Sequence, residues 1–343
     1  MNTDEKYMRV ALNLAKKGEG FTSPNPMVGA VIVKNGRIVG KGYHKRCGSA
    51  HAEVNAVKDA GKKAGGASLY VTLEPCDRFG RTPPCTDALI ESGIKRAVIA
   101  MKDPNPANNG RGIKKLAGSG IKVKTGVLRK EAIALNKPYI KFITKKLPYV
   151  TVKMAESIDG KIAAKSGESR WITGEESGRY VHSLRAKSDA VMVGANTILK
   201  DDSLLLSKRS GAKQPVRIVV CGRRTIPGNA RIFSQIDKSP VILARSKAGR
   251  MDLRRLLSEL AKREIANILV EGGGELVASL VEERLVDRFL FFIAPKIIGG
   301  RLAKTAVEGV GVDRISRAIP LKFVKIKRFK EDILIEAEVS RRA

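Results

Sequence analysis

Three residues of the types that bind zinc lie in the first third of the chain: His51, Cys76 and Cys85. A neutral imidazole and two thiolates would supply three ligands and leave the fourth position of a tetrahedral zinc open for water. A zinc ion in such a site lowers the pKa of its water to ~7, which makes hydroxide available at neutral pH. Glu53 follows the histidine by two positions, so its carboxylate can reach that water as a general acid and base. The H-x-E…P-C…C pattern is typical of zinc deaminases, which attack a ring carbon that bears an amine.

The elements expected around these residues would bring them together. Residues 50–60 are expected to form a helix with His51 in its first turn, and residues 67–73 alternate like a strand that ends just before the first cysteine. Residues 86–92 are expected to form a second helix that starts at the second cysteine. The positive end of a helix dipole favours thiolate and metal-bound hydroxide. A structural zinc site, or two buried cysteines without a metal, is the alternative interpretation.

The rest of the first half indicates an α/β layered sheet. Residues 4–17 have the spacing of an amphipathic helix, and Asn35-Gly36 is a hairpin turn between two strands. The expected strands are 27–33, 37–43, 97–101 and 121–125. Residues 136–148 carry many lysines and two prolines, so we interpret them as a linker and place the domains at 1–146 and 147–343.

The second half begins again with a strand and alternates β-rich runs with helices. The expected strands are 149–155, 189–193, 216–220, 241–244, 268–270 and 288–294, with a helix at 252–263. Three glycines, Gly272, Gly273 and Gly274, stand between a strand and a helix that runs through Glu283. Such a run lets backbone N–H groups approach a phosphate at the helix N-terminus, although a plain loop would fit it as well.

Composition sets further limits. The chain of 343 residues is too long for one ordinary core, and its apolar content of 43% suits globular domains. No run of 18 apolar residues is present, so no membrane span is expected, and the acidic N-terminus argues against a secretory signal. Four cysteines are too few for a disulfide scaffold, which predicts a reducing cytoplasm. Cys47 is expected to be a small buried residue, with a role as an alternative ligand left open, and Cys221 is expected to play no part in the metal site.

The formal net charge of +31 is extreme. A nucleic-acid partner is the first interpretation of such a charge. The basic residues are nevertheless spread along the chain, and aromatic residues make up only 5%, which leaves few stacking platforms. We therefore expect no specific nucleic acid, and the same field would attract a phosphorylated substrate and NADPH. These patterns do not explain why the charge is so large.

Taken together, the motifs resemble the bifunctional riboflavin-biosynthesis deaminase–reductase family, over nearly the whole chain. In the first half they are TSPNPMVG at 22–29, HAEVNA at 51–56, LEPCD at 73–77, GRTPPC at 80–85 and DPNP at 103–106. In the second half they are KMAESIDG at 153–160, WIT at 171–173, HSLRA at 182–186, TILKDD at 197–202 and EGGG at 271–274. The resemblance implies a zinc-hydroxide deamination of a diaminopyrimidinone that carries a ribosylamino 5′-phosphate. NADPH then reduces the ribosyl group to ribityl.

For the first half, the resemblance implies a cytidine-deaminase-like three-layer domain. Zinc would be held by His51, Cys76 and Cys85, with Glu53 as the catalytic proton shuttle. Substrate contacts would come from Asn25, His44, Arg81, Asp103 and Asn105. A turn, loop or surface role is the alternative for each of these five residues.

For the second half, the resemblance implies a dihydrofolate-reductase-like domain in which Lys153 and Asp201 are catalytic, and a homodimer or homotetramer formed through it. Substrate contacts would come from Ser169, Arg185, Leu204, Lys208, Arg209 and Glu271. NADPH contacts would come from Ala155, Trp171, Thr197, Asp201, Arg223, Arg224, Gly272, Gly273 and Gly274. Core packing is the alternative for Trp171, and a helix-surface charge for Arg185.

Two departures from the family pattern matter. Ser203 stands where the family usually has proline, and the following arginine position falls on Lys208 with Arg209 next to it. After the strand at 216–220 the chain has two arginines, Arg223 and Arg224, and no acidic residue that would repel a 2′-phosphate. This favours NADPH over NADH.

Two competing functions remain open from the sequence. One is a nucleic-acid or nucleoside deaminase with an unrelated basic C-terminal domain, and the other is a basic RNA-binding protein that retains an inactive zinc site. The long Cys76–Cys85 spacing argues against the first, because such deaminases usually show P-C-x-x-C. The complete set of His51, Glu53 and the two cysteines argues against the second.

Overall fold

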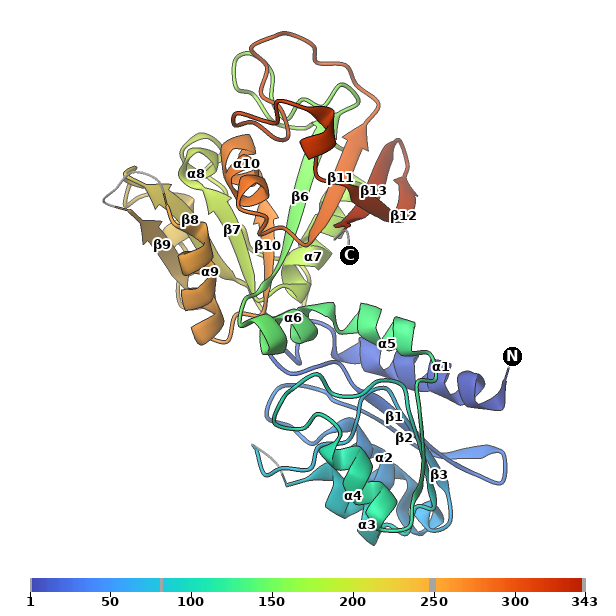
Figure 1. Cartoon of the computed structure of the whole chain (residues 1–343). Coiled ribbons are helices and arrows are strands. Elements are labelled where there is room, and N and C mark those ends of the chain that lie inside the picture. The colour runs from blue at the N-terminus through green and yellow to red at the C-terminus, as the bar shows by residue number, and fades with distance from the viewer. Residues whose placement is uncertain (1, 81–82, 247–250, 341–343) are drawn as a thin grey trace. The chain divides into compact units, whose positions relative to one another are not determined.

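The computed structural model describes residues 2–80, 83–246 and 251–340. The chain divides into two compact units, Met1–Leu147 and Pro148–Ala343, each with its own sheet and helices (Figure 1). Among the described residues, no helix has both the length and the apolar character that a membrane span requires.

The sheet of the first unit has five strands in the order β2-β1-β3-β4-β5. The strands are β1 (Gly29–Lys34), β2 (Arg37–Tyr43), β3 (Ser68–Val71), β4 (Arg96–Ile99) and β5 (Lys122–Thr125). β1 pairs antiparallel with β2 and β3, whereas β3, β4 and β5 run parallel. Asn35 and Gly36 have φ values of 50° and 73°, which a tight hairpin turn requires, so the predicted hairpin is confirmed.

Helices cover both faces of this sheet. They are α1 (Thr3–Ala15), α2 (Ala52–Ala60), α3 (Cys85–Glu91), α4 (Arg111–Gly118), α5 (Arg129–Leu135) and α6 (Lys137–Lys145). In Figure 1, α1, α5 and α6 lie on one side of the sheet and α2, α3 and α4 on the other. Two glycines of β2 let α2 approach closely, because a Cβ at Gly40 would lie 2.4 Å from the Ala56 carbonyl oxygen and one at Gly42 would lie 2.2 Å from that of Ala52. This contact fixes the first turn of α2, which carries Glu53, against the sheet.

The structure corrects two details of the sequence interpretation. α2 begins at Ala52, so His51 is the extended N-cap residue and does not lie in the first turn. The stretch at 136–148 is mostly the helix α6, not a linker. Pro138 stands at the start of that helix, where the missing N–H costs nothing, so the proline does not break it.

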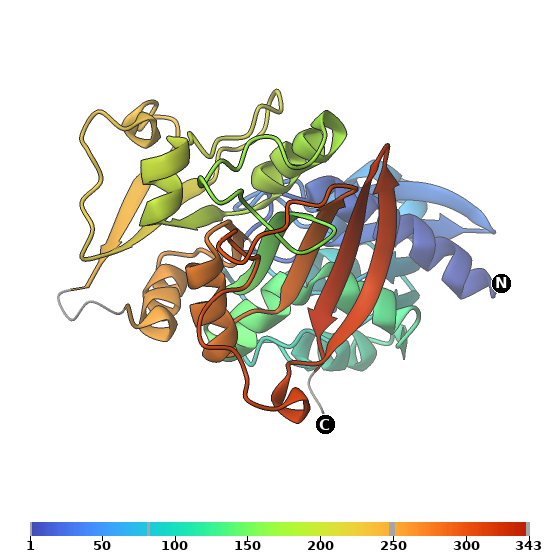
Figure 2. The ribbon, with the colours of Figure 1, turned by 90° about the horizontal axis from the view of Figure 1, so that it is seen from above.

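The sheet of the second unit has eight strands in the order β12-β13-β11-β6-β10-β7-β8-β9. They are β6 (Tyr149–Ser157), β7 (Ala190–Gly194), β8 (Val216–Gly222), β9 (Val241–Arg245), β10 (Asn267–Glu271), β11 (Arg288–Ala294), β12 (Leu321–Phe329) and β13 (Asp332–Val339). The six strands from β11 to β9 are parallel. β13 joins them antiparallel, and β12 pairs with β13 as the outer edge of the sheet (Figure 2).

The helices of the second unit connect these strands. They are α7 (Glu175–Lys187), α8 (Ala195–Asp201), α9 (Leu253–Lys262) and α10 (Gly274–Glu282). Val181 and Leu184 of α7 and Ile198 of α8 are buried in one core with Val191 and Val219 of the sheet. The parallel strands all end at one edge of the sheet, where α/β proteins commonly bind ligands.

Candidate active sites of the two units

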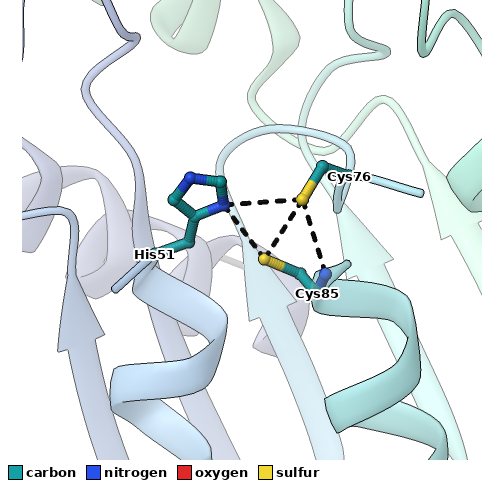
Figure 3. A group of neighbouring side chains, drawn as sticks. All are labelled: His51, Cys76 and Cys85. Carbon is teal, nitrogen blue, oxygen red and sulfur yellow. Dashed lines mark hydrogen bonds between the residues drawn. The ribbon is translucent and has the colours of Figure 1, made fainter. Parts of the chain in front are cut away.

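Three side chains converge at the edge of the sheet in the first unit (Figure 3). The His51 Nδ1 atom lies 3.1 Å from the Cys85 Sγ atom and 3.5 Å from the Cys76 Sγ atom, and the two sulfur atoms are 3.4 Å apart. His51 precedes α2, Cys76 follows β3, and Cys85 is the first residue of α3. The backbone N–H of Cys85 donates to the Cys76 sulfur at 3.4 Å, which favours a thiolate there.

The spacing of these atoms suits a zinc ion. A tetrahedron with Zn–S bonds of about 2.3 Å and a Zn–N bond of about 2.0 Å has edges of about 3.5 Å. One nitrogen and two sulfur atoms at such separations match three of its corners. Cys47 and Cys221 lie outside this group. The three predicted ligands therefore lie together, and the fourth corner is left for water.

Glu53 is buried at the same place, with only 4% of its surface exposed. Burial raises the pKa of its carboxyl to about 7, and the Cys85 side chain bonds to it. A carboxyl group whose pKa lies near the working pH both accepts and donates a proton readily. The position and the environment of Glu53 therefore suit a proton shuttle.

His44 and Asn25 form a pair next to the ligand group. The Asn25 Nδ2 atom lies 3.2 Å from the His44 Nε2 atom, and the His44 Nδ1 atom lies 3.3 Å from the Ala50 carbonyl oxygen. The rings of His44 and His51 meet edge to face at 5.2 Å. His44 is only 2% exposed, so it is a buried residue and not an exposed loop histidine, and this burial lowers its pKa.

Asp103 and Asn105 lie in a loop with a dense hydrogen-bond network. The Asp103 Oδ1 atom accepts from the Asn105 N–H at 2.9 Å and from the Tyr139 hydroxyl at 2.8 Å. Its Oδ2 atom accepts from the Asn108 side chain at 3.2 Å. The Asp103 N–H in turn donates to the Glu74 carboxylate at 3.0 Å. The Asp103 carboxylate is therefore engaged by the protein itself, and Arg81, the remaining predicted contact, lies outside the described residues.

A large cavity of about 1230 Å³ opens at the carboxyl edge of the parallel strands in the second unit. Nearly all the residues predicted for the reductase line it. These are Lys153, Ala155, Ser169, Trp171, Arg185, Thr197, Asp201, Leu204, Lys208, Arg224, Glu271, Gly272, Gly273 and Gly274. Arg209 and Arg223 are not among its lining residues. Of each neighbouring pair, one residue therefore lines the cavity: Lys208 rather than Arg209, and Arg224 rather than Arg223.

Lys153 and Glu271 stand opposite each other on the neighbouring strands β6 and β10. Burial lowers the pKa of Lys153, and the nearby Glu271 charge opposes this. Burial alone would raise the pKa of Glu271, but Arg185 and Lys153 outweigh it and the net shift is downward. Two opposite charges are thus held side by side at the cavity wall.

Asp201 is the last residue of α8, and its Oδ1 atom accepts from the Ser169 hydroxyl at 3.0 Å. Trp171 lines the same cavity with 83% of its surface exposed, so it is not a core residue. A large aromatic ring exposed beside a cavity offers a face for a flat ligand.

The glycine run lies between β10 and α10. Gly272 and Gly273 have φ values of 74° and 82°, which other residues rarely adopt. A Cβ at Gly274 would lie 2.6 Å from the Thr305 carbonyl oxygen, and one at Gly273 would lie 3.5 Å from the Thr197 hydroxyl. The three glycines therefore form a turn with bare backbone at a helix N-terminus, as a phosphate-bearing cofactor requires.

The sequence did not reveal three residues of the first site: Glu74, Asn136 and Tyr139. Glu74 lies in a recognised motif, but the two others come from a stretch that looks like a linker. Their role depends on contacts across more than thirty residues, with separations of 36 for Tyr139 to Asp103 and 109 for Asn136 to Met27. No local pattern encodes such contacts.

Comparisons with known protein families match a different family to each unit. The family model of the cytidine and deoxycytidylate deaminase zinc-binding region matches residues 1–101. The model of the RibD C-terminal domain matches residues 148–335, which is more than half of the chain.

Whole proteins match as well. The riboflavin biosynthesis protein RibD of Aquifex aeolicus is 43% identical over 97% of each chain, and that of Escherichia coli is 39% identical over 97% of this chain and 98% of its own. Among solved structures, RibD of Acinetobacter baumannii matches with a TM-score of 0.92 and 34% identity, covering 99% of each chain. A diaminohydroxyphosphoribosylaminopyrimidine deaminase/5-amino-6-(5-phosphoribosylamino)uracil reductase from Thermotoga maritima matches with a TM-score of 0.89 and 37% identity, covering 98% of this chain and 99% of its own.

These relatives extend through both units, so the second half is not an unrelated basic domain. The first unit has the cytidine-deaminase-like fold and the second the dihydrofolate-reductase-like fold. With a zinc-ligand group in one unit and a cofactor cavity in the other, the chain belongs to the RibD family of bifunctional riboflavin-biosynthesis enzymes.

Proposed function

We propose that the chain catalyses two consecutive steps of riboflavin biosynthesis, one in each unit. The first is the hydrolytic deamination of 2,5-diamino-6-ribosylamino-4(3H)-pyrimidinone 5′-phosphate, and the second is the reduction of its ribosyl group to ribityl by NADPH. The observation that carries this proposal is the pairing, in one chain, of the His51/Cys76/Cys85 group beside buried Glu53 with a glycine-lined cavity.

In the deaminase, His51, Cys76 and Cys85 would hold zinc, which when bound lowers the pKa of a water molecule. Glu53 would accept a proton from that water and deliver it to the ring nitrogen. It would then carry a second proton from the hydroxyl added to the ring carbon to the departing amine. As a buried carboxyl whose pKa is raised to about 7, it can perform both transfers near neutral pH.

The neighbouring polar residues would orient the pyrimidine. The Asn25 amide, fixed by its contact with His44, presents a donor and an acceptor to a ring edge. The Asn105 side chain lies in the adjoining loop, whose backbone is fixed by Asp103. In this arrangement Asp103 contributes by holding the loop, because its own oxygens are already engaged.

In the reductase, NADPH supplies a hydride when bound. Lys153 and Asp201 would act at the sugar, where carbon 1′ accepts the hydride and its bond to the ring oxygen breaks. The Lys153 ammonium would donate a proton to that oxygen, and Ser169 would orient Asp201. Glu271 would contact the ribose hydroxyls, and Lys208, with Leu204, would line the path of the substrate phosphate.

The cofactor would extend from Trp171 and Ala155 to the glycine run and Thr197, with Arg224 near the 2′-phosphate. We also propose a cytoplasmic location, since thiolate ligands and cysteines outside disulfides need a reducing compartment.

An oligomer of identical chains is the further part of this proposal. β12 is an edge strand, and along it Phe323 and Ile326 are 66% and 64% exposed. Exposed apolar side chains on an unpaired edge strand favour pairing with another strand, here that of a second copy. Light scattering should show a dimer or tetramer, and Phe323→Lys should shift it toward the monomer; an unchanged mass in that variant would move the interface elsewhere.

The decisive experiment follows the masses of the products. The purified protein is incubated with the diaminopyrimidinone phosphate. Without NADPH, the product should show an amine replaced by oxygen; with NADPH, it should carry two further hydrogen atoms. Recovery of unchanged substrate from zinc-loaded protein would contradict the proposal, and deamination without any reduction would confine it to the first unit.

A further inference from the structure

The first turn of α6 makes two contacts with the deaminase site that no motif assigns. The deaminase family model ends at residue 101, and the reductase model begins at residue 148. Residues 102–147, including α6, lie between them. α6 nevertheless belongs to the first unit, where Tyr139 is part of the core and Ile140 and Ile143 pack against it.

Asn136 binds the backbone of the loop that carries Asn25. Its side-chain oxygen accepts from the Met27 N–H at 2.8 Å, and its side-chain nitrogen donates to the Met27 carbonyl at 3.0 Å. The Asn136 side-chain amide thus forms hydrogen bonds with both the N–H and the carbonyl group of Met27, as the backbone of a neighbouring β-strand would. Met27 lies two residues after Asn25. This pair of hydrogen bonds therefore fixes the loop next to Asn25, the asparagine that we propose contacts the pyrimidine.

The position of Asn136 makes this arrangement informative. It is the N-cap residue of α6, and an asparagine there commonly accepts from an N–H of its own helix. In this structure no such capping bond forms, and Asn136 is only 1% exposed. Its side chain therefore serves the distant loop instead of its own helix.

Tyr139 makes the second contact, one turn further along. Its hydroxyl donates to the Asp103 carboxylate at 2.8 Å, and its side chain is 9% exposed. The same carboxylate oxygen accepts from the Asn105 N–H, so the hydroxyl holds the loop that presents Asn105. Asn136 and Tyr139 thus hold the two loops that flank the site from one short segment.

We propose that Asn136 and Tyr139 are positioning residues of the deaminase, which hold the Asn25 loop and the Asp103–Asn105 loop in the conformation that binds the pyrimidine. This inference rests on the proposed deaminase function. Neither residue touches the zinc ligands in any described contact, so their effect is on substrate binding and not on the metal or the proton transfer.

The expected signature follows from population arithmetic. When only a fraction of molecules has competent loops, the apparent dissociation constant rises by the inverse of that fraction. Molecules that bind substrate still react at the normal rate. Loss of an anchor should therefore raise KM for deamination and leave kcat nearly unchanged.

Tyr139→Phe is the sharpest test, because it removes one oxygen atom and keeps the ring in the core. KM for deamination should rise roughly 10- to 100-fold, with kcat within about twofold of the parent, since a hydrogen bond to a charged group is lost. Asn136→Ala should act in the same direction. Zinc content and reductase kinetics should not change in either variant.

Tyr7→Phe is the matched control. Tyr7 is also buried in the first unit, and its hydroxyl donates to the Gly36 carbonyl at 2.6 Å, in the hairpin turn at the other end of β1. The Tyr7→Phe variant loses a comparable hydrogen bond from a hydroxyl group without affecting either loop. Its KM for deamination should therefore stay at the parental value.

An unchanged KM in Tyr139→Phe, or an equal rise in Tyr7→Phe, would overturn the inference and leave α6 a purely structural helix. A fall in kcat alone would also overturn it, since it would place the effect on the chemical step. If the parent protein itself fails to deaminate the substrate while it binds zinc, the proposed function fails instead, and the two failures are distinguished.

Discussion

Arg185 donates to both carboxylate oxygens of Glu271, from Nε at 2.6 Å and from Nη2 at 2.9 Å. Its third nitrogen, Nη1, donates to the Leu206 carbonyl at 3.1 Å. All three nitrogens are therefore engaged within the protein. We infer that Arg185 orients Glu271 in the reductase cavity and that its guanidinium is not available to the substrate phosphate. Lys208 is then a cation predicted for substrate contact that lines the cavity.

Replacing Arg185 should therefore damage both stability and reduction. Arg185→Ala leaves the Glu271 carboxylate buried without its partner, which typically costs about 3–5 kcal/mol. The second unit should unfold at lower urea concentration and reduce its substrate slowly, while deamination continues. Arg185→Lys keeps the positive charge but cannot donate to both carboxylate oxygens in the bidentate geometry of arginine. Its stability and its reduction rate should therefore lie between those of the parent and of Arg185→Ala. Normal reduction by Arg185→Ala would show that Glu271 needs no such support.

Glu53→Gln should bind zinc as the parent does and lose deamination by ~10²–10⁴-fold, because only the proton shuttle is removed. Metal analysis and a deamination assay on the same sample check both parts. Glu91→Gln, at an exposed glutamate of α3, is the control. Substantial deamination by Glu53→Gln would assign the proton transfer to another group.

Zinc should be present at about one ion per chain and depend on two of the four cysteines. Cys76→Ser and Cys85→Ser should lose it, because a hydroxyl is a far weaker ligand than a thiolate. Cys47→Ser and Cys221→Ser should retain it, since these two cysteines lie outside the ligand group. Metal analysis of the four proteins gives the answer, and loss of zinc from Cys47→Ser would require a different ligand set.

The cofactor preference should depend on one arginine of the pair. Arg224 lines the cavity and Arg223 does not, so only Arg224→Ala should weaken NADPH binding, by roughly 10- to 100-fold. NADH binding should barely change in either variant. Quenching of Trp171 fluorescence by each cofactor measures all four affinities, and equal losses for NADH and NADPH would place the 2′-phosphate elsewhere.

A pH effect on stability should come from Asp4 in α1. Its carboxylate accepts from Arg96 at 2.8 and 3.0 Å, from Lys124 at 2.8 Å and from the Tyr70 hydroxyl at 3.0 Å. Hydrogen bonding to Arg96, with Lys124 and Tyr70, holds the pKa of Asp4 well below its usual value of 3.8. The folded pKa is the lower one, so the stabilisation is complete above about pH 5 and is lost as the pH falls toward the folded pKa.

Asp4→Asn should therefore cost about 1–2 kcal/mol at pH 7, and the difference from the parent should shrink between about pH 5 and pH 2. The value is modest because the Arg96 and Lys124 side chains are 34% and 49% exposed, where solvent screens their charge. Urea unfolding at several pH values measures it. A difference that stays constant with pH would mean that the loss is one of packing.

Much of the fold could be predicted because the sequence marks it locally. Asn35-Gly36 identifies the first hairpin, and apolar runs identify the strands from β6 to β11. By contrast, β12 is exposed along almost its whole length, so it has no inward-facing pattern to recognise. α7 carries a glycine and six charged or histidine residues among its 13, and its apolar face is correspondingly weak.

The zinc ligands could be predicted because residue type and spacing alone restrict their chemistry. The supporting contacts could not, because they depend on register and on distant packing. Nothing near Asp103 indicates that Tyr139 will engage its carboxylate, and nothing near Arg185 indicates that Glu271 will take up its guanidinium. Residue types therefore predict which groups do chemistry, whereas the folded structure decides which of them are left available to a ligand.

The place of α6 bears on how this fused enzyme could be taken apart. A gene fragment that stops at the end of the zinc-binding region, residue 101, would encode every metal ligand and yet omit Asn136 and Tyr139. A free-standing deaminase would have to carry the chain through α6, to about residue 147. The segment that contains α6 is thus part of the deaminase unit and not a linker between the two enzymes. The position at which the polypeptide could be divided without disrupting either unit lies immediately before β6.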